Sequence, residues 1–193
     1  MRMTFPRIHD PLFRFGIGPI NLKYSLTKRN YKITLDYMKL LMDVDCLIKL
    51  TKAGLKELVA NKDSVSIPEP VKREVVDAGK KKQCSDAFAV EKNIESKRIA
   101  VIDLPIQIEK GDQALIAIYR EEDYDAIATD DTKLTRQLKA LNIPFILPAL
   151  VLYRLLKESK IDYKMALWAL RQLSEFISED EFSTVRLLME KEK

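Results

Sequence analysis

The chain has 193 residues, of which 47% are hydrophobic and 32% are charged, a composition typical of an ordinary globular domain with room for a small extension. With two cysteines and one histidine we expect neither a disulfide framework nor a zinc site built from these residues, and the thiols suggest a cytoplasmic protein. No apolar run has the length of a membrane span, so we expect no membrane partner. The start of the chain has no continuous apolar core followed by a small-residue cleavage site, so we expect no secretory signal.

The net charge of +4 is concentrated near the N-terminus. Residues 1–40 carry eight basic and two acidic side chains, and residues 1–38 lack a clear pattern apart from two alternating segments around "TKRN". We predict a basic N-terminal extension over residues 1–38 that contains a hairpin. Its charge suits a polyanionic partner, and the alternative is a solvated or oligomer-forming arm.

From residue 39 onward, short apolar segments alternate with segments of helical periodicity. Strands are predicted over "KLLMDV", "SVSI", "RIAVIDL", "YDAIATD" and "IPFILP". Helices are predicted for Asp45–Ala60 with a break near Gly54, for Pro68–Gly79, for "SDAFAVEKN", from Asp112 through "ALIAIYREE", and for "DTKLTRQLKALN". This alternation predicts a three-layer α/β/α fold with a central parallel sheet.

The C-terminal part of the chain is predicted to be helical. Residues 149–191 contain three helical segments, and the last begins near Ser178, where "SEDE" resembles a capping box. Apolar residues between Leu167 and Ile177 have helical spacing, which predicts core packing, with a dimer seam or a groove for a partner peptide as the alternatives. We place the domain at residues 39–160 and a C-terminal helical extension at residues 161–193.

Four acidic residues come just after predicted strands. Asp43 ends the first strand, Glu74 lies in the helix after the second, Asp112 opens the helix after the third, and Asp130 follows the fourth. Because the carboxyl ends of parallel strands meet at one edge of a sheet, we expect these carboxylates to form one cluster. Clustered carboxylates repel each other, and hard cations such as Mg²⁺ or Mn²⁺, which prefer oxygen ligands, relieve that repulsion.

Each of these acids also has an ordinary structural explanation. Asp112 follows a glycine and can cap its helix, and the Asp-Asp pair that begins at Asp130 can cap the next one. Glu74 can be an exposed helix residue, as most glutamates are. Asp43 is the hardest to explain in this way, because it interrupts an apolar strand.

The chain resembles the PIN-domain family, and in particular its bacterial and archaeal toxin-ribonuclease branch. The resemblance lies in four segments that occur in order, "LLMDVDCLIKLTKAGL", "IPEPVKREVVDAG", "GDQALIAIYREEDYDAIATDD" and "LNIPFI". It implies a nuclease in which Asp43, Glu74, Asp112 and Asp130 hold one or two Mg²⁺ or Mn²⁺ ions and catalyse hydrolysis of RNA. It also implies a homodimer or higher homo-oligomer and, for a toxin, an antitoxin protein as partner.

Five further residues are candidates for supporting roles. Thr129 is placed to hydrogen-bond a water that binds the metal, and Asp131 is a supporting carboxylate. Asp45 stands where the family usually has a small polar residue, so it is either an additional ligand or a helix cap. Lys133 and Arg136 follow the acid pair on the next predicted helix, from where we expect them to contact RNA phosphates.

Two other functions fit parts of the sequence. The Asp43-x-Asp45 pattern is similar to the motif of haloacid-dehalogenase phosphohydrolases, in which Asp43 would be the nucleophile and Asp45 the acid and base. The residues that follow, Cys46 and Lys49, fit that motif poorly. The other alternative is a non-catalytic RNA-binding or assembly subunit, which would bind RNA without dependence on divalent ions.

Overall fold

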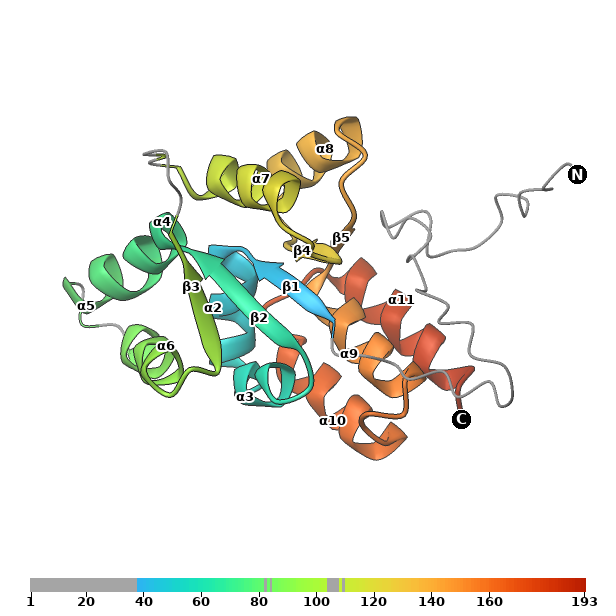
Figure 1. Cartoon of the computed structure of the whole chain (residues 1–193). Helices are drawn as coiled ribbons and strands as arrows, with labels where there is room; N and C mark the ends of the chain where they lie inside the picture. The colour runs from blue at the N-terminus through green and yellow to red at the C-terminus, as the bar shows by residue number, and fades with distance from the viewer. Residues whose placement is uncertain (1–37, 82, 84, 104–107, 109) are drawn as a thin grey trace, which may run out of the picture.

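The structure is a computed structural model that describes residues 38–81, 83, 85–103, 108 and 110–193 (Figure 1). The predicted N-terminal extension and its hairpin lie outside the described residues, apart from Met38.

A parallel sheet forms the centre of the molecule (Figure 1). Its five strands lie in the order β3-β2-β1-β4-β5, and each neighbouring pair is parallel. The strands are β1 (Lys39–Met42), β2 (Ser64–Pro68), β3 (Ile99–Ile102), β4 (Ala126–Ala128) and β5 (Phe145–Ile146). The predicted α/β fold with a central parallel sheet is therefore confirmed.

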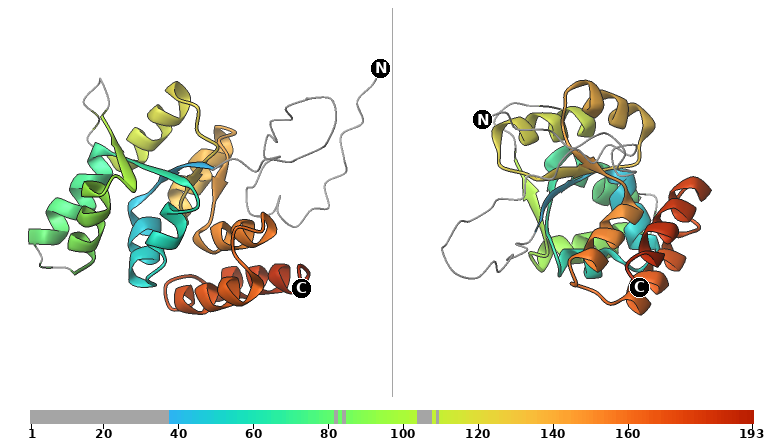
Figure 2. Two further views of the ribbon diagram at one scale, coloured as in Figure 1. Left: turned by 60° about the horizontal axis from the view of Figure 1, so that its bottom comes forward. Right: turned by 90° about the vertical axis from the view of Figure 1, so that its right-hand side faces the viewer.

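Helices cover both faces of this sheet (Figures 1 and 2). They are α2 (Val44–Lys52), α3 (Lys56–Ala60), α4 (Glu69–Lys72), the π-helical turn η1 (Arg73–Asp77), α5 (Ala78–Lys81), α6 (Ser85–Glu95), α7 (Gly111–Glu121), α8 (Thr132–Ala140), α9 (Pro148–Lys157), α10 (Tyr163–Leu173) and α11 (Glu179–Glu190). Helices α7 and α8 pack on one face, and α2, α3 and the C-terminal helices pack on the other. In the described part of the chain no helix is long and apolar enough to cross a membrane.

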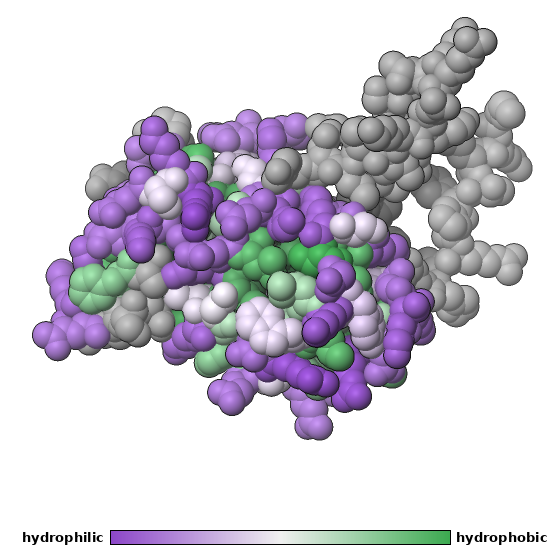
Figure 3. Space-filling view, turned by 90° about the horizontal axis from the view of Figure 1, so that it is seen from below, coloured by the Kyte–Doolittle hydropathy of each residue, from purple (hydrophilic) through white to green (hydrophobic). Residues whose placement is uncertain are grey.

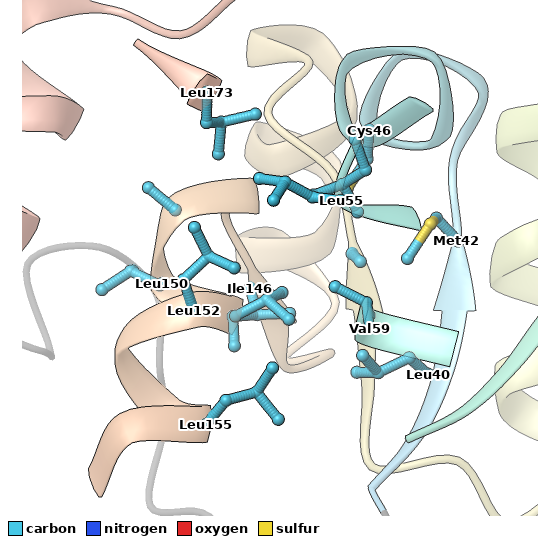
Figure 4. Packing of buried hydrophobic residues seen from close by; sticks show 14 of the residues in the cluster. Leu40, Met42, Cys46, Leu55, Val59, Ile146, Leu150, Leu152, Leu155 and Leu173 are labelled. Atoms are coloured by element: carbon cyan, nitrogen blue, oxygen red, sulfur yellow. The ribbon is translucent and has the colours of Figure 1, made fainter. Parts of the chain in front are cut away.

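The strand β1 divides its side chains between two apolar clusters, as the twofold period of a strand requires. Leu41 is fully buried in the smaller cluster, which α7 and α8 complete. Leu40 and Met42 point to the larger cluster on the opposite face, together with residues of α3 and α9 such as Val59 and Leu150 (Figure 4). Burial on both faces explains why β1 is a continuous apolar run that ends only at its carboxyl edge.

The predicted break in the first helix is confirmed at Gly54. Helix α2 ends at Lys52, and Gly54 has a φ of +70°, a left-handed conformation that a glycine adopts without steric cost. The N–H of Leu55 then donates to the carbonyl of Leu50 at 2.7 Å, which closes the end of the helix in the manner of a Schellman motif. The chain can therefore turn back directly into α3.

The helix predicted for Pro68–Gly79 differs from the observed one in two respects. Its middle is the π-helical turn η1, and the helix continues beyond Gly79 to the end of α5. Tertiary contacts explain the continuation, because Lys80 Nζ lies 2.6 Å from Glu91 Oε1 and 5.7 Å from the ring centre of Phe88, both on α6. Contacts to a neighbouring helix thus outweigh the helix-ending preference of glycine.

The C-terminal helices share the larger apolar cluster with the sheet. Leu170 and Leu173 of α10 are fully buried, as the apolar spacing predicts, whereas Trp168 is 48% exposed and Met165 is 42% exposed. Seen from below, over α3 and α10, hydrophobic residues gather near the centre of the face and hydrophilic residues surround them (Figure 3). The predicted apolar stripe is therefore split between the core and the surface.

An ionic cluster lies at the amino end of the sheet. Asp63, which precedes β2 and whose side chain is fully buried, pairs with Arg154 of α9 and accepts a hydrogen bond from the N–H of Met38 at 3.3 Å. Arg154 also pairs with Glu158 at 2.5 Å, and Lys160 lies 3.4 Å from Asp63 Oδ1. These contacts tie β1 and β2 to α9 at the edge opposite Asp43.

Candidate active site

Asp43 is the first residue after β1 and the N-cap of α2. Its backbone N–H continues the ladder with β4 by donating to the carbonyl of Ala128 at 3.0 Å. The carboxylate is buried, with 5% of the residue exposed, and both of its oxygens are engaged. Oδ1 accepts from the N–H of Val44 at 2.7 Å, and Oδ2 accepts from the hydroxyl of Thr129 at 2.8 Å. The predicted role of Asp45 as helix cap is therefore taken by Asp43.

The environment of Asp43 disfavours its charged form. The pKa of Asp43 is raised from 3.8 to about 6, chiefly by burial and to a smaller extent by the carboxylates of Asp45 and Asp112. The hydrogen bonds from Thr129 and Val44 lower the pKa, but they do not offset the loss of hydration. A cation bound to Asp43 would stabilise the ionised carboxylate and offset the cost of burying its charge, as a metal site requires.

Asp112 lies in the first turn of α7, on the same edge of the sheet. Burial and the neighbouring carboxylate of Asp131 raise the pKa of Asp112, and Lys133 lowers it. Two smaller effects are that Asp45 raises this pKa and Lys110 lowers it. The N-cap of α7 is Lys110, so Asp112 is not the capping residue that one interpretation of the sequence suggested. Three segments far apart in the chain therefore bring carboxylates into one electrostatic cluster.

Glu74 approaches the same place from the π-helical turn η1. A Cβ atom built on Gly111 would lie 3.5 Å from Oε1 of Glu74 and 3.8 Å from Oε2, and 3.1 Å from Cγ2 of Val71. The Glu74 carboxylate therefore lies against the first residue of α7, directly before Asp112. The wider turn of a π-helix changes the direction of its side chains, and such turns occur frequently at functional sites.

The neighbouring residues Asp130 and Asp131 have different partners. Asp130 forms an ion pair with Lys49 of α2, and its Oδ1 is buried without a hydrogen-bond partner. Asp131 caps α8, because its Oδ1 accepts from the N–H of Leu134 at 2.6 Å, and its own N–H donates to Thr129 Oγ1 at 3.1 Å. The carboxylate that interacts with Asp112 is thus that of Asp131, while Asp130 faces α2.

Two buried groups beside the Lys49–Asp130 pair could not be recognised as part of this region from sequence. Burial raises the pKa of Glu181 to about 7, and the carboxylate of Asp130 also raises it. The hydrogen bond that Glu181 Oε1 accepts from the N–H of Ala149 at 2.8 Å lowers this pKa but does not offset the effect of burial. Cys46 is a buried free thiol whose pKa is raised by burial and by Asp130. Glu181 lies far along the chain from Asp130, so spacing carries no signal for it.

The donor atoms at this edge suit a hard divalent cation. Among the residues that the structure describes, no three Asp, Glu, His or Cys side chains already converge in a metal-binding arrangement. Asp112 nevertheless raises the pKa of Asp43, Asp131 raises that of Asp112, and all three side chains offer only oxygen. Mg²⁺ and Mn²⁺ prefer this donor set of carboxylate oxygens.

The two predicted phosphate contacts lie on α8, which begins directly after Asp131. Lys133 and Arg136 are both exposed in the first half of the helix that Asp131 caps. The influence of Lys133 on the pKa of Asp112 places its ammonium group close to the acids.

Comparison with known protein families agrees with the sequence patterns. The profile of the family described as PIN domain (DUF3368) matches residues 39–191, most of the chain. This match confirms the resemblance drawn from the four segments, and it extends beyond residue 160 through α10 and α11. A comparison with curated proteins found no match to the chain.

Proposed function

We propose that this chain, which belongs to the PIN-domain family, is a metal-dependent endoribonuclease. Membership of the family supports a nuclease-like function. The observation that carries the proposal is the cluster of Asp43, Asp112 and Asp131 at the carboxyl edge of the sheet, with Glu74 against the start of α7. RNA as the substrate, and Mg²⁺ or Mn²⁺ as the cofactor, are parts of the proposal.

In this mechanism the protein supplies ligands and a water-positioning group. Asp43 and Asp112 hold one or two ions, and Thr129 keeps the Asp43 carboxylate fixed through its hydroxyl. When bound, the metal acidifies an attacking water and neutralises charge that develops on the phosphodiester. Glu74 is a further ligand or orients that water. Hydrolysis then leaves a 5′-phosphate on one product and a 3′-hydroxyl on the other.

The choice between Asp130 and Asp131 as the remaining ligand follows from their partners. The ligand role predicted for Asp130 stays a prediction. Its pairing with Lys49, and the interaction of Asp131 with Asp112, favour Asp131 as the group that turns toward the metal. In that arrangement Asp131 keeps one oxygen for the N–H of Leu134 and offers the other.

The proposal is tested with 5′-labelled single-stranded and structured RNAs incubated with Mn²⁺, Mg²⁺ or EDTA. We expect cleavage only with a divalent ion, and products with 5′-phosphate ends. Turnover of p-nitrophenyl phosphate without RNA cleavage would instead support the phosphohydrolase, with Asp43 as nucleophile. Tight RNA binding that is equal in Mn²⁺ and EDTA, without cleavage, would support a binding or assembly subunit.

We predict that Mn²⁺ stabilises the protein more at about pH 8 than at about pH 5. Asp43, whose pKa is about 6, must lose its proton before it can bind a metal. At roughly 100 times the dissociation constant a ligand stabilises by about 2.7 kcal/mol, and tenfold proton competition would reduce this to about 1.4 kcal/mol. Urea unfolding with and without Mn²⁺ at both pH values measures the difference. Equal stabilisation at the two pH values would contradict a site that includes Asp43.

We predict that Lys133→Ala and Arg136→Ala weaken RNA binding, because each variant removes a cation that would bind a phosphate. Either substitution should reduce the slope of log K against log salt concentration by about 0.7 to 1. Binding is measured in EDTA over a series of KCl concentrations, and Lys164→Ala, at an exposed lysine on α10, is the matched control. If the control lowers the slope as much as the α8 variants do, RNA does not lie along α8.

The remaining expectations are part of the same proposal. RNA is the expected macromolecular substrate, and a homodimer or higher homo-oligomer and an antitoxin protein are expected because the family suggests them. A cytoplasmic location is expected from the use of free cysteines.

A further inference from the structure

The ion pair between Lys49 and Asp130 joins α2 to the carboxyl end of β4. Both side chains are partly buried, with 26% of Lys49 and 15% of Asp130 exposed. The second oxygen of Asp130 is buried and has no hydrogen-bond partner. Lys49 is therefore the main compensation for the Asp130 charge, and Glu181 adds a further acidic group nearby.

The turn that contains Asp130 is held on both sides. Thr129 donates to the carboxylate of Asp43, and Asp131 caps α8 on the side of Asp112. Consecutive residues of an extended segment point to opposite sides, so Asp130, which lies between them, is directed the other way toward Lys49. Thr129 thus ties the turn to the start of α2, Asp130 ties it to Lys49 in the body of α2, and Asp131 ties it to α8.

We propose that Lys49 is a positioning residue, which holds Asp130 away from the metal-binding carboxylates and thereby sets the turn that presents Thr129 and Asp131. The inference rests on the proposed function, since it concerns the geometry of that same site. Lys49 acts through Asp130 and does not itself contact the substrate.

The physical reason is the cost of a buried charge without a partner. An isolated surface ion pair contributes little, but removal of one member of a buried pair leaves the other charge uncompensated. Without Lys49, the Asp130 carboxylate would lose its partner, and a cation held by the neighbouring carboxylates would attract it. Asp130 would then compete with Asp131, and the turn would shift with it.

The test uses Lys49→Met, which removes the charge and keeps most of the length, together with Lys49→Arg, Asp130→Asn and the double variant Lys49→Met/Asp130→Asn. Lys52→Met is the matched control, because Lys52 is an exposed lysine of the same helix. The readouts are urea unfolding in EDTA, Mn²⁺ binding by calorimetry and single-turnover cleavage of RNA.

We expect Lys49→Met to lower the stability of the metal-free protein. It should also reduce Mn²⁺ affinity or turnover by about 10- to 100-fold, as substitution of a residue that orients a ligand does. The double variant should recover most of that change, because it removes the carboxylate that Lys49 restrains. Lys49→Arg should stay close to the wild type. If Lys49→Met does not fold, the double variant and Lys49→Arg, compared with Lys52→Met, still test the recovery.

Three results would overturn the inference. Lys49→Met could behave like Lys52→Met in Mn²⁺ binding and turnover, which would show that the pair has no positioning role. The double variant could remain as impaired as Lys49→Met with unchanged Mn²⁺ affinity, which would assign Lys49 to the substrate. If the wild type neither binds Mn²⁺ nor cleaves RNA, the proposed function itself is wrong, and the inference is wrong with it.

Discussion

We expect Asp43→Asn to make the metal-free protein more stable at about pH 8, by on the order of 2–3 kcal/mol in the free energy of unfolding. The pKa of Asp43 is raised from 3.8 to about 6, so the folded protein holds this proton more tightly than the unfolded chain does. Ionisation of Asp43 therefore destabilises the fold progressively between about pH 4 and pH 6, and above that range the destabilisation is complete. Asparagine has nearly the same shape without the charge: its amide oxygen can accept from the N–H of Val44, and its amide NH₂ must then donate to the Thr129 hydroxyl.

Urea unfolding in EDTA at about pH 8 and about pH 3 measures this effect. The two proteins should be about equally stable at the lower pH, where most Asp43 side chains are protonated in both the folded and the unfolded state. Asp45→Asn is the matched control, because Asp45 is an exposed carboxylate of the same helix and should change stability by less than about 0.5 kcal/mol. Reduced stability of Asp43→Asn at about pH 8, together with equal stability at about pH 3, would show that the ionised carboxylate has a compensating partner in the metal-free state.

The second large effect concerns the ionic cluster at the opposite edge of the sheet. We expect Asp63→Ala to lower the free energy of unfolding by up to about 3–5 kcal/mol, because the guanidinium of Arg154, whose side chain is 6% exposed, then keeps Glu158 but loses the fully buried Asp63. The Met38 N–H also loses its acceptor. Urea unfolding measures the destabilisation, and the folded fraction should keep its activity because the cluster is distant from Asp43.

The double variant Asp63→Leu/Arg154→Met separates charge from packing. Burial raises the pKa of Asp63 despite the neighbouring Arg154 and Lys160, which indicates that the cost of dehydration outweighs the attraction within the pair. Apolar residues of similar volume should therefore recover most of the stability. If the double variant is as unstable as Asp63→Ala, the ionic cluster is itself a net source of stability.

Much of the fold could be predicted because local pattern and global fold agree. The apolar run of β1 ends at Asp43, and the alternation of strands with helices requires a parallel sheet whose carboxyl ends meet. From this the positions of Asp43 and Asp112 at one edge followed directly. The influence of Asp112 on the pKa of Asp43 depends on burial, which the spacing of residues does not predict.

The division between Asp130 and Asp131 illustrates what sequence leaves open. The alternation of side chains along a strand says that the two point to opposite sides, but not which side faces Asp112. That depends on Lys49, which pairs with Asp130 from a helix 81 positions earlier in the chain. The π-helical turn that carries Glu74 is similar, because the helical spacing of Pro68–Gly79 predicts an ordinary helix there.

Glu181 shows how a correct local motif can have a non-local outcome. Ser178 caps α11 as predicted, by accepting from the N–H of Glu181 at 3.1 Å. In a capping box the Glu181 carboxylate would return to the same helix end. Instead it accepts from the N–H of Ala149 at the start of α9, so it satisfies a different helix and lies near Asp130.

The most direct test of a metal-dependent nuclease is single-turnover cleavage of one RNA by the wild type and by Asp43→Asn, each with saturating Mn²⁺. We predict that the wild type cleaves only when the metal is present, and that Asp43→Asn, although more stable without metal, cleaves at least about 100-fold more slowly. Cleavage that survives EDTA, or an equal rate in Asp43→Asn, would contradict a metal centre built around Asp43.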